Sequence, residues 1–184
     1  MTKALLVIDY TNDFVADNGS LTCGKAGQAI EARITALAKE YAEAGEYVVF
    51  AVDLHYAGDT LHPENKLFPP HNIAGTEGRA LYGSLGALYE QIKDLPNVLW
   101  MDKTRYSCFA GTPLQQLLTE RGIREVALCG VCTDICVLHT AVEAYNLGYG
   151  ITVHGDAVAS FSPEGHSWAL GHFSGSLGAA VQGV

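Results

Sequence analysis

The apolar residues of the chain fall into short continuous runs, and amphipathic stretches separate these runs. A continuous apolar run of strand length is typical of a strand buried on both faces of a parallel sheet. Apolar residues that recur every three or four positions instead indicate a helix packed on one side. The runs predict strands at about 4–8, 47–52, 98–101, 126–129, 150–154 and 179–181. Helical patterns occupy 28–44, 85–92, 113–121 and 137–145, and a further helix begins near Ser162 and Pro163.

Strands and helices alternate along the whole chain, and this alternation predicts the fold class. It is typical of α/β proteins with a mostly parallel sheet and helices on both faces. The 184 residues suffice for one domain with a sizeable core, and no linker or internal repeat divides them. We therefore expect a single α/β domain that spans residues 1–184.

The stretch from Glu125 to Leu147 contains the most informative strand-to-helix connection. The apolar strand ends at an expected turn at Gly130, and Thr133 and Asp134 are candidate helix caps. Cys136 then falls near the first helical turn, where unpaired backbone N–H groups favour a thiolate and lower the cysteine pKa. Such a cysteine is a candidate nucleophile, although a small buried core residue is the simpler interpretation. The predicted inward face of the helix comprises Val137, Thr140, Ala141, Ala144 and Tyr145.

Four polar residues follow the ends of four different predicted strands: Asp9, Asp53, Lys103 and Cys136. Open parallel sheets bind their ligands beyond the carboxyl ends of the strands, so we expect these side chains to converge. Asp9 can accept the thiol proton of Cys136, and the Lys103 ammonium can stabilise both carboxylate and thiolate. Backbone N–H groups of the turn from Cys132 to Cys136 can hold an oxyanion. The predicted chemistry is acyl transfer through a thioester, with water as the final acceptor.

A second polar group belongs to the long irregular stretch between Leu54 and Leu85, and loops of this length in compact domains usually have a function. An Asp-x-His pair at a strand end brings two ligands within reach of one ion. The loop supplies a further carboxylate and a further imidazole, and such ligands suit zinc, iron or manganese. His62 competes for a ligand role, and spacing does not decide between the histidines. The predicted metal ligands are Asp53, His55, Glu64 and His71.

Composition and charge exclude several classes of protein. The formal net charge is −9 and no basic cluster is present, which argues against nucleic-acid binding. The apolar runs are far shorter than the ~20 residues of a membrane span. The chain enters a strand at its N-terminus, so no signal peptide is expected. The five cysteines are an odd number without a disulfide spacing, so we predict a reducing, cytoplasmic location.

The close spacing of Cys129, Cys132 and Cys136 raises an electron-transfer alternative, an iron–sulfur cluster. Cluster ligation normally needs four ligands gathered by a loop, whereas Cys129 lies inside a predicted strand. The spacing therefore favours a nucleophile over a cluster.

Several motifs follow one another in a specific order: VIDYTNDF at the first strand, DLH at 53–55, FPPH at 68–71, DK at 102–103 and GVCTDICV at 130–137. Taken together, these motifs resemble those of the isochorismatase-like cysteine hydrolases, and among them the nicotinamidases. The resemblance runs from about Leu5 to Gly178.

This resemblance implies a three-layer fold with a central six-stranded sheet and a set of site residues. The implied catalytic triad is Asp9, Lys103 and Cys136. A cis peptide bond between Val131 and Cys132 would aim the N–H groups of Cys132 and Cys136 at the oxyanion. Asp53, His55, Glu64 and His71 would bind one divalent metal ion, zinc before iron or manganese, which holds the ring nitrogen of the substrate. Phe14, Phe68 and Tyr106 would enclose the aromatic ring.

The implied activity is hydrolysis of nicotinamide to nicotinate and ammonia, in NAD salvage, with pyrazinamide as a further substrate. The expected partner is a small pyridine carboxamide, with neither nucleic acid nor membrane, and the expected assembly is a homo-oligomer. Two other functions are compatible with the same residues. One is a cysteine amidase acting on an N-carbamoyl or ureido compound, and the other is a non-catalytic binding protein of the same fold.

Overall fold

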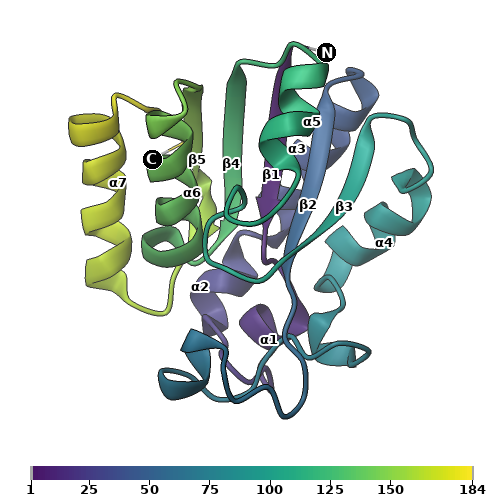
Figure 1. Ribbon diagram of the computed structural model, residues 1–184, viewed down its shortest axis with the longest axis vertical. Helices are drawn as coiled ribbons and strands as arrows, with labels where there is room; N and C mark the ends of the chain where they lie inside the picture. The colour runs from purple at the N-terminus through teal and green to yellow at the C-terminus, as the bar shows by residue number, and fades with distance from the viewer. Residues whose placement is uncertain (1, 184) are drawn as a thin grey trace.

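The computed structural model describes residues 2–183 and contains a sheet of six strands (Figure 1). The strands are β1 Lys3–Ile8, β2 Tyr47–Asp53, β3 Val98–Lys103, β4 Glu125–Val131, β5 Gly150–Ala159 and β6 Ala180–Gln182. Their order across the sheet is β3-β2-β1-β4-β5-β6, and the neighbouring strands are all parallel. The predicted α/β fold with a six-stranded parallel sheet is confirmed.

Helices connect the strands. They are α1 Asn12–Val15, α2 Gly24–Ala29, α3 Glu31–Glu43, α4 Gly83–Ile92, α5 Leu114–Glu120, α6 Leu138–Asn146 and α7 Pro163–Leu177. Short 3₁₀ turns lie at η1 Pro63–Lys66 and η2 Glu77–Arg79, and a π-helical turn lies at η3 Thr133–Val137. Within residues 2–183, none of the helices combines the length and hydrophobicity that crossing a bilayer requires.

The two faces of the sheet pack against different helices, as β1 illustrates. Ala4, Leu6 and Ile8 belong to the core beneath α5, α6 and α7, whereas Leu5 and Val7 belong to the core beneath α3 and α4. Figure 1 shows α5 and α6 in front of the sheet and α3 behind it. Successive strand side chains point to opposite faces, so a central strand between two helical layers needs a continuous apolar run.

Some element boundaries differ from the sequence-based prediction. The helix expected at 28–44 is divided between α2 and α3 at Ile30, and the preceding loop contains α1. Strand β5 continues to Ala159, because the polar pair Gly155 and Asp156 interrupts its apolar run without ending the ladder. Tyr145 was expected to face inward but is 52% exposed, since the buried stripe of α6 passes through Thr140, Ala141 and Ala144 instead.

The turn expected at Gly130 is also wrong, because β4 continues through this residue to Val131. Gly130 has a φ of 117°, and the β4–β5 register shifts between Leu128 and Gly130. A Cβ atom added to Gly130 would lie 2.0 Å from the Ile8 carbonyl oxygen on the neighbouring strand. Glycine therefore permits both the unusual backbone angle and the close approach of β1 to β4.

Substituting Gly130 with alanine should lower the free energy of unfolding by about 3–5 kcal/mol, through backbone strain and the clash with β1. Gly148→Ala is the matched control, because Gly148 also has a positive φ, 79°, but open space around its Cα. The control should lose only about 1–2 kcal/mol. Urea denaturation followed by circular dichroism measures both values, and equal losses would contradict the close-approach explanation.

Candidate active site

The sheet order brings the predicted site residues to one edge. Strands β3, β2, β1 and β4 are neighbours, and their carboxyl ends lead to Lys103, Asp53, Asp9 and Cys136. Asp9 directly follows β1 with a φ of 54°, a left-handed conformation that is uncommon outside glycine. Its backbone N–H donates to the Ala51 carbonyl oxygen at 3.0 Å, so neighbouring β2 holds this conformation in place.

Lys103 lies at the centre of the cluster, with its side chain completely buried. Its Nζ atom is 2.7 Å from Asp9 Oδ2, 3.1 Å from Asp53 Oδ1 and 3.7 Å from Cys136 Sγ. Asp9 Oδ1 accepts the Asp53 backbone N–H at 2.8 Å. Asp9 Oδ2 has the ion pair with Lys103 but no aligned hydrogen bond within the described residues, so it keeps acceptor capacity. The structure thus places a carboxylate, an ammonium and a thiol in mutual contact.

Burial and pairing set the charges of this cluster. Burial raises the pKa of Asp9 to about 6, against the lowering effect of Lys103. Burial also acts to raise the pKa of Asp53, but Lys103 and His55 outweigh it and hold that pKa at about 2. Burial acts to lower the pKa of Lys103, whereas Asp53 and Asp9 raise it well above its ordinary value. At neutral pH the cluster therefore contains one ammonium between two carboxylates.

The sequence-based expectation of a lowered cysteine pKa is wrong for this protein. Burial raises the pKa of the Cys136 thiol well above its ordinary value, and Lys103 offsets this only in part. Cys136 is 5% exposed, so loss of hydration outweighs the partial charge of the helix start. The resting sulfur is a thiol, and a base must take its proton before it can attack.

The turn that carries Cys136 also differs from the expected helix start. Cys132 occupies the N-cap position without a side-chain cap, so Thr133 and Asp134 do not cap this helix as predicted. Thr133 Oγ1 instead lies 2.8 Å from His166 Nδ1, and Asp134 Oδ1 accepts the Ser160 hydroxyl at 2.6 Å. These contacts tie the turn to the start of α7.

The backbone of the turn before Cys136 has an irregular hydrogen-bond pattern. The peptide bond between Val131 and Cys132 is cis, as the family resemblance implied. The Cys132 carbonyl oxygen accepts the N–H groups of Ile135 and Val137 at 3.1 and 3.2 Å, and this pattern skips the N–H of Cys136. In this π-helical turn the Cys136 N–H therefore does not donate to the Cys132 carbonyl oxygen. This suits the role in the oxyanion hole that is predicted for the Cys136 N–H.

The four predicted metal ligands form a compact buried group. Asp53, His55, Glu64 and His71 each offer one ligand atom, and these atoms all lie within 4.8 Å of one another. His71 Nε2 is buried and has no hydrogen-bond partner among the described residues, although it lies 3.5 Å from Glu64 Oε2. Two carboxylates and two imidazoles around an unpartnered ring nitrogen are a donor set that fits a divalent ion.

His62 is not a member of this group, even though its ring lies 4.4 Å from that of His55. Its Nε2 pairs with the Thr104 carbonyl oxygen at 2.8 Å, and its Nδ1 accepts the Glu64 N–H at 3.3 Å. Both ring nitrogens are therefore engaged. Spacing left this histidine open as a ligand, and the hydrogen bonds assign it to holding Glu64.

The predicted aromatic residues line a small, partly open pocket beside the sulfur, with a cavity volume of about 10 Å³. Phe14, Phe68 and Tyr106 all contribute to its wall, together with Cys136. The sequence reasoning missed other members of this wall: Leu21, Ile135 and Phe161. Phe161 follows the carboxyl end of β5, so the strand-end rule would have found it had the full length of β5 been predicted.

Two neighbouring features lie outside the predicted set. Cys132 Sγ is 3.5 Å from Cys23 Sγ, so two thiols are in contact between the turn after β4 and the segment that follows α1.

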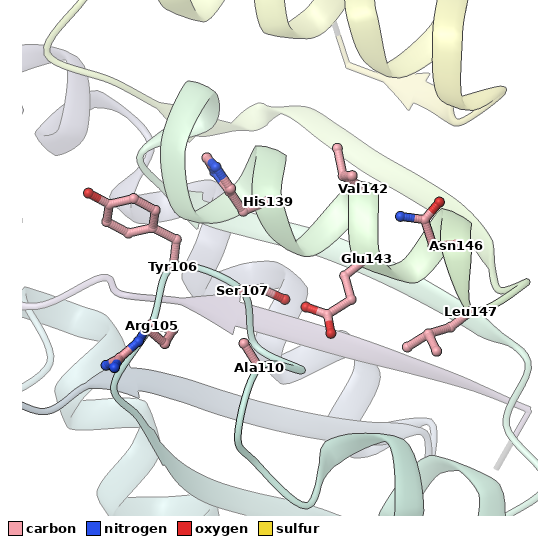
Figure 2. A pocket seen from close by; sticks show the side chains of 9 residues that line it. All are labelled: Arg105, Tyr106, Ser107, Ala110, His139, Val142, Glu143, Asn146 and Leu147. Carbon is pink, nitrogen blue, oxygen red and sulfur yellow. The ribbon is translucent and has the colours of Figure 1, made fainter. Parts of the chain in front are cut away.

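A wider hollow lies beside Tyr106, between α6 and the segment that follows β3 (Figure 2). Tyr106 lines both spaces, whereas Cys136 and Glu64 line the small pocket and not the wider hollow. The chemistry therefore belongs to the smaller space.

Comparison with known proteins places this site in a family. The isochorismatase domain model matches residues 3–183. A nicotinamidase/pyrazinamidase structure from Bacillus subtilis is 61% identical over 98% of this chain and 99% of that chain, with a TM-score of 0.97. A Streptococcus mutans pyrazinamidase/nicotinamidase is 53% identical with the same coverage and a TM-score of 0.96. A Pyrococcus horikoshii pyrazinamidase in complex with zinc is 26% identical over both full chains, with a TM-score of 0.86. The chain belongs to the isochorismatase family.

Proposed function

We propose that this protein is an amidohydrolase that converts nicotinamide to nicotinate and ammonia, and that it also hydrolyses pyrazinamide. The observation that carries the proposal is the contact of Lys103 with Asp9 and Cys136, beside a small pocket lined by aromatic side chains. The similarity to nicotinamidase/pyrazinamidase structures over nearly the whole chain supports the same substrate class. NAD salvage, a homo-oligomeric assembly and a cytoplasmic location are further parts of this prediction.

In the proposed first half-reaction, the Asp9 carboxylate takes the thiol proton of Cys136 and the Lys103 ammonium stabilises the thiolate. The thiolate attacks the carboxamide carbon, and the backbone N–H groups of Cys132 and Cys136 hold the oxyanion. The carbon–nitrogen bond breaks, Asp9 returns its proton to the nitrogen, and ammonia leaves behind a thioester. The raised pKa of Asp9, about 6, suits a residue that must both accept and release a proton.

In the second half-reaction, Asp9 takes a proton from a water molecule, whose oxygen attacks the thioester carbon. The carbon–sulfur bond breaks, Asp9 returns its proton to the Cys136 sulfur, and the acid product passes its carboxyl proton to solvent and leaves as nicotinate. Phe14, Phe68 and Tyr106 pack around the pyridine ring and exclude bulk water from the intermediate.

Asp53, His55, Glu64 and His71 would hold one divalent metal ion, for which zinc is the first expectation and iron or manganese also suit the ligands. When bound, such an ion supplies a Lewis-acid contact for the ring nitrogen of the substrate. Glu64 and His71 lie on the irregular segment after β2, while Asp53 ends β2. The ligand set therefore joins the long irregular segment after β2 to the edge of the sheet.

Removal of divalent metal should reduce kcat/KM for nicotinamide by about two orders of magnitude or more, since a Lewis-acid contact supplies several kcal/mol. Ammonia release, measured before and after dialysis against a chelator and again after zinc addition, tests this expectation. His71→Ala should mimic metal removal, whereas His172→Ala on α7 should not. Full activity of metal-free protein on an N-carbamoyl compound, with none on nicotinamide, would overturn the proposal.

A further inference from the structure

Asn72 directly follows the candidate ligand His71 and is completely buried. Its φ is 45°, in the left-handed region that asparagine tolerates better than most residues. It lies in the irregular segment between β2 and α4, whose position regular secondary structure does not fix. Hydrogen bonds must therefore hold Asn72 in place.

Three hydrogen bonds connect Asn72 to the surrounding site. Its carbonyl oxygen accepts the His55 backbone N–H at 3.1 Å, and its own backbone N–H donates to Asp13 Oδ2 at 2.7 Å. Its side-chain Oδ1 accepts the Thr11 hydroxyl at 2.9 Å, in a fully buried bond across 61 positions of sequence. One residue thus contacts the segments of both candidate imidazole ligands and the loop after β1.

Thr11 extends this connection to the proposed base. Its backbone N–H donates to the Asp9 carbonyl oxygen at 2.8 Å, and its side chain is completely buried. The path from Asp9 through Thr11 to Asn72 therefore consists of short hydrogen bonds within the protein interior. Removing one partner of such a bond leaves a buried polar group unsatisfied.

We propose that Asn72 is a positioning residue that, through Thr11 and Asp13, sets the imidazoles of His55 and His71 relative to Asp9. The inference rests on the proposed function, because it assumes that the two histidines bind the metal ion. Groups that orient ligands in this way typically change metal affinity by about 10–100-fold when they are removed. The Thr11–Asn72 bond would thus hold the metal group in a fixed position relative to the proposed base, Asp9.

The test measures zinc affinity by competition with a chromophoric chelator, together with kcat and KM for nicotinamide. Thr11→Val keeps the side-chain shape but removes the donor, whereas Thr11→Ser keeps the donor. Asn72→Gly keeps the left-handed backbone but removes the acceptor. We expect Thr11→Val and Asn72→Gly to weaken zinc binding about 10–100-fold and to lower kcat/KM, and Thr11→Ser to retain both values.

Thr35→Val is the control, because the Thr35 hydroxyl donates to Glu31 within α3, away from the site. If Asn72→Gly does not fold, the comparison of Thr11→Val with Thr11→Ser tests the positioning role by itself. Wild-type zinc affinity in Thr11→Val, or an equal loss in Thr11→Ser, would overturn the positioning role alone. A wild-type protein that binds zinc without releasing ammonia would overturn the proposed function and leave the positioning role standing. A wild-type protein that binds none of zinc, iron and manganese would overturn the positioning role, and ammonia release from nicotinamide would then test the proposed function by itself.

Discussion

Substituting Cys136 with alanine should reduce nicotinamide turnover by about five to six orders of magnitude, as expected when a covalent nucleophile is removed. The proposed reaction passes through a thioester on this sulfur, and an alanine side chain cannot form one. Cys136 is buried in the core beneath α6, so circular dichroism and thermal unfolding must show that the variant is folded. Ammonia release under saturating nicotinamide gives the rate.

Cys132→Ala is the matched control, since Cys132 is equally buried and only four residues away. In the proposed mechanism it contributes its backbone N–H, which alanine retains, so most of the activity should remain. Loss of the Cys132 contact with Cys23 should affect stability more than turnover. If Cys132→Ala were inactive and Cys136→Ala active, the nucleophile would be Cys132 and not Cys136.

Lys103→Met should destabilise the protein as well as inactivate it. The substitution keeps the length of the side chain but leaves the carboxylates of Asp9 and Asp53 buried without their shared counter-charge. Breaking a buried ion pair from one side typically costs about 3–5 kcal/mol. Urea denaturation of the metal-free protein at neutral pH measures this loss, and the ammonia assay measures the loss of activity.

Lys93→Met provides the comparison, because Lys93 pairs with Glu90 on the exposed side of α4 and should leave the unfolding midpoint unchanged. A Lys103→Met variant as stable as the wild type would mean that one of the two buried carboxylates is protonated in the folded protein. That result would contradict the charge distribution on which the proposed proton transfer to Asp9 depends.

The sequence could predict the residues at the sheet edge because of how the strands end. β1 is apolar from Ala4 up to Asp9, β2 is apolar up to Asp53, and β3 ends on Lys103. A charged residue after a buried parallel strand must lie at the carboxyl edge, so the fold class alone predicts that these residues converge. The contacts between these side chains cannot be predicted from sequence spacing. They come from the distances and the burial that the structure shows.

Other parts of the site depend on tertiary context. The irregular segment after β2 offered His55, His62 and His71 as equivalent candidates, and hydrogen bonds to both nitrogens of His62 distinguish it. The raised pKa of Cys136 follows from its burial, whereas the local sequence showed only the helix start. Phe161 and Cys23 reach the site from segments that carried no recognisable motif.

The strand order also determines when the protein can become active during synthesis. The groups required for chemistry lie between positions 9 and 136, and β4 inserts between β1 and β5. A nascent chain that has formed β1, β2 and β3 already holds the base and the ammonium but lacks the sulfur. In the proposed mechanism, catalytic competence therefore requires β4 and its turn at the centre of the sheet, so recovered activity after refolding would report the assembly of strands β1 to β4.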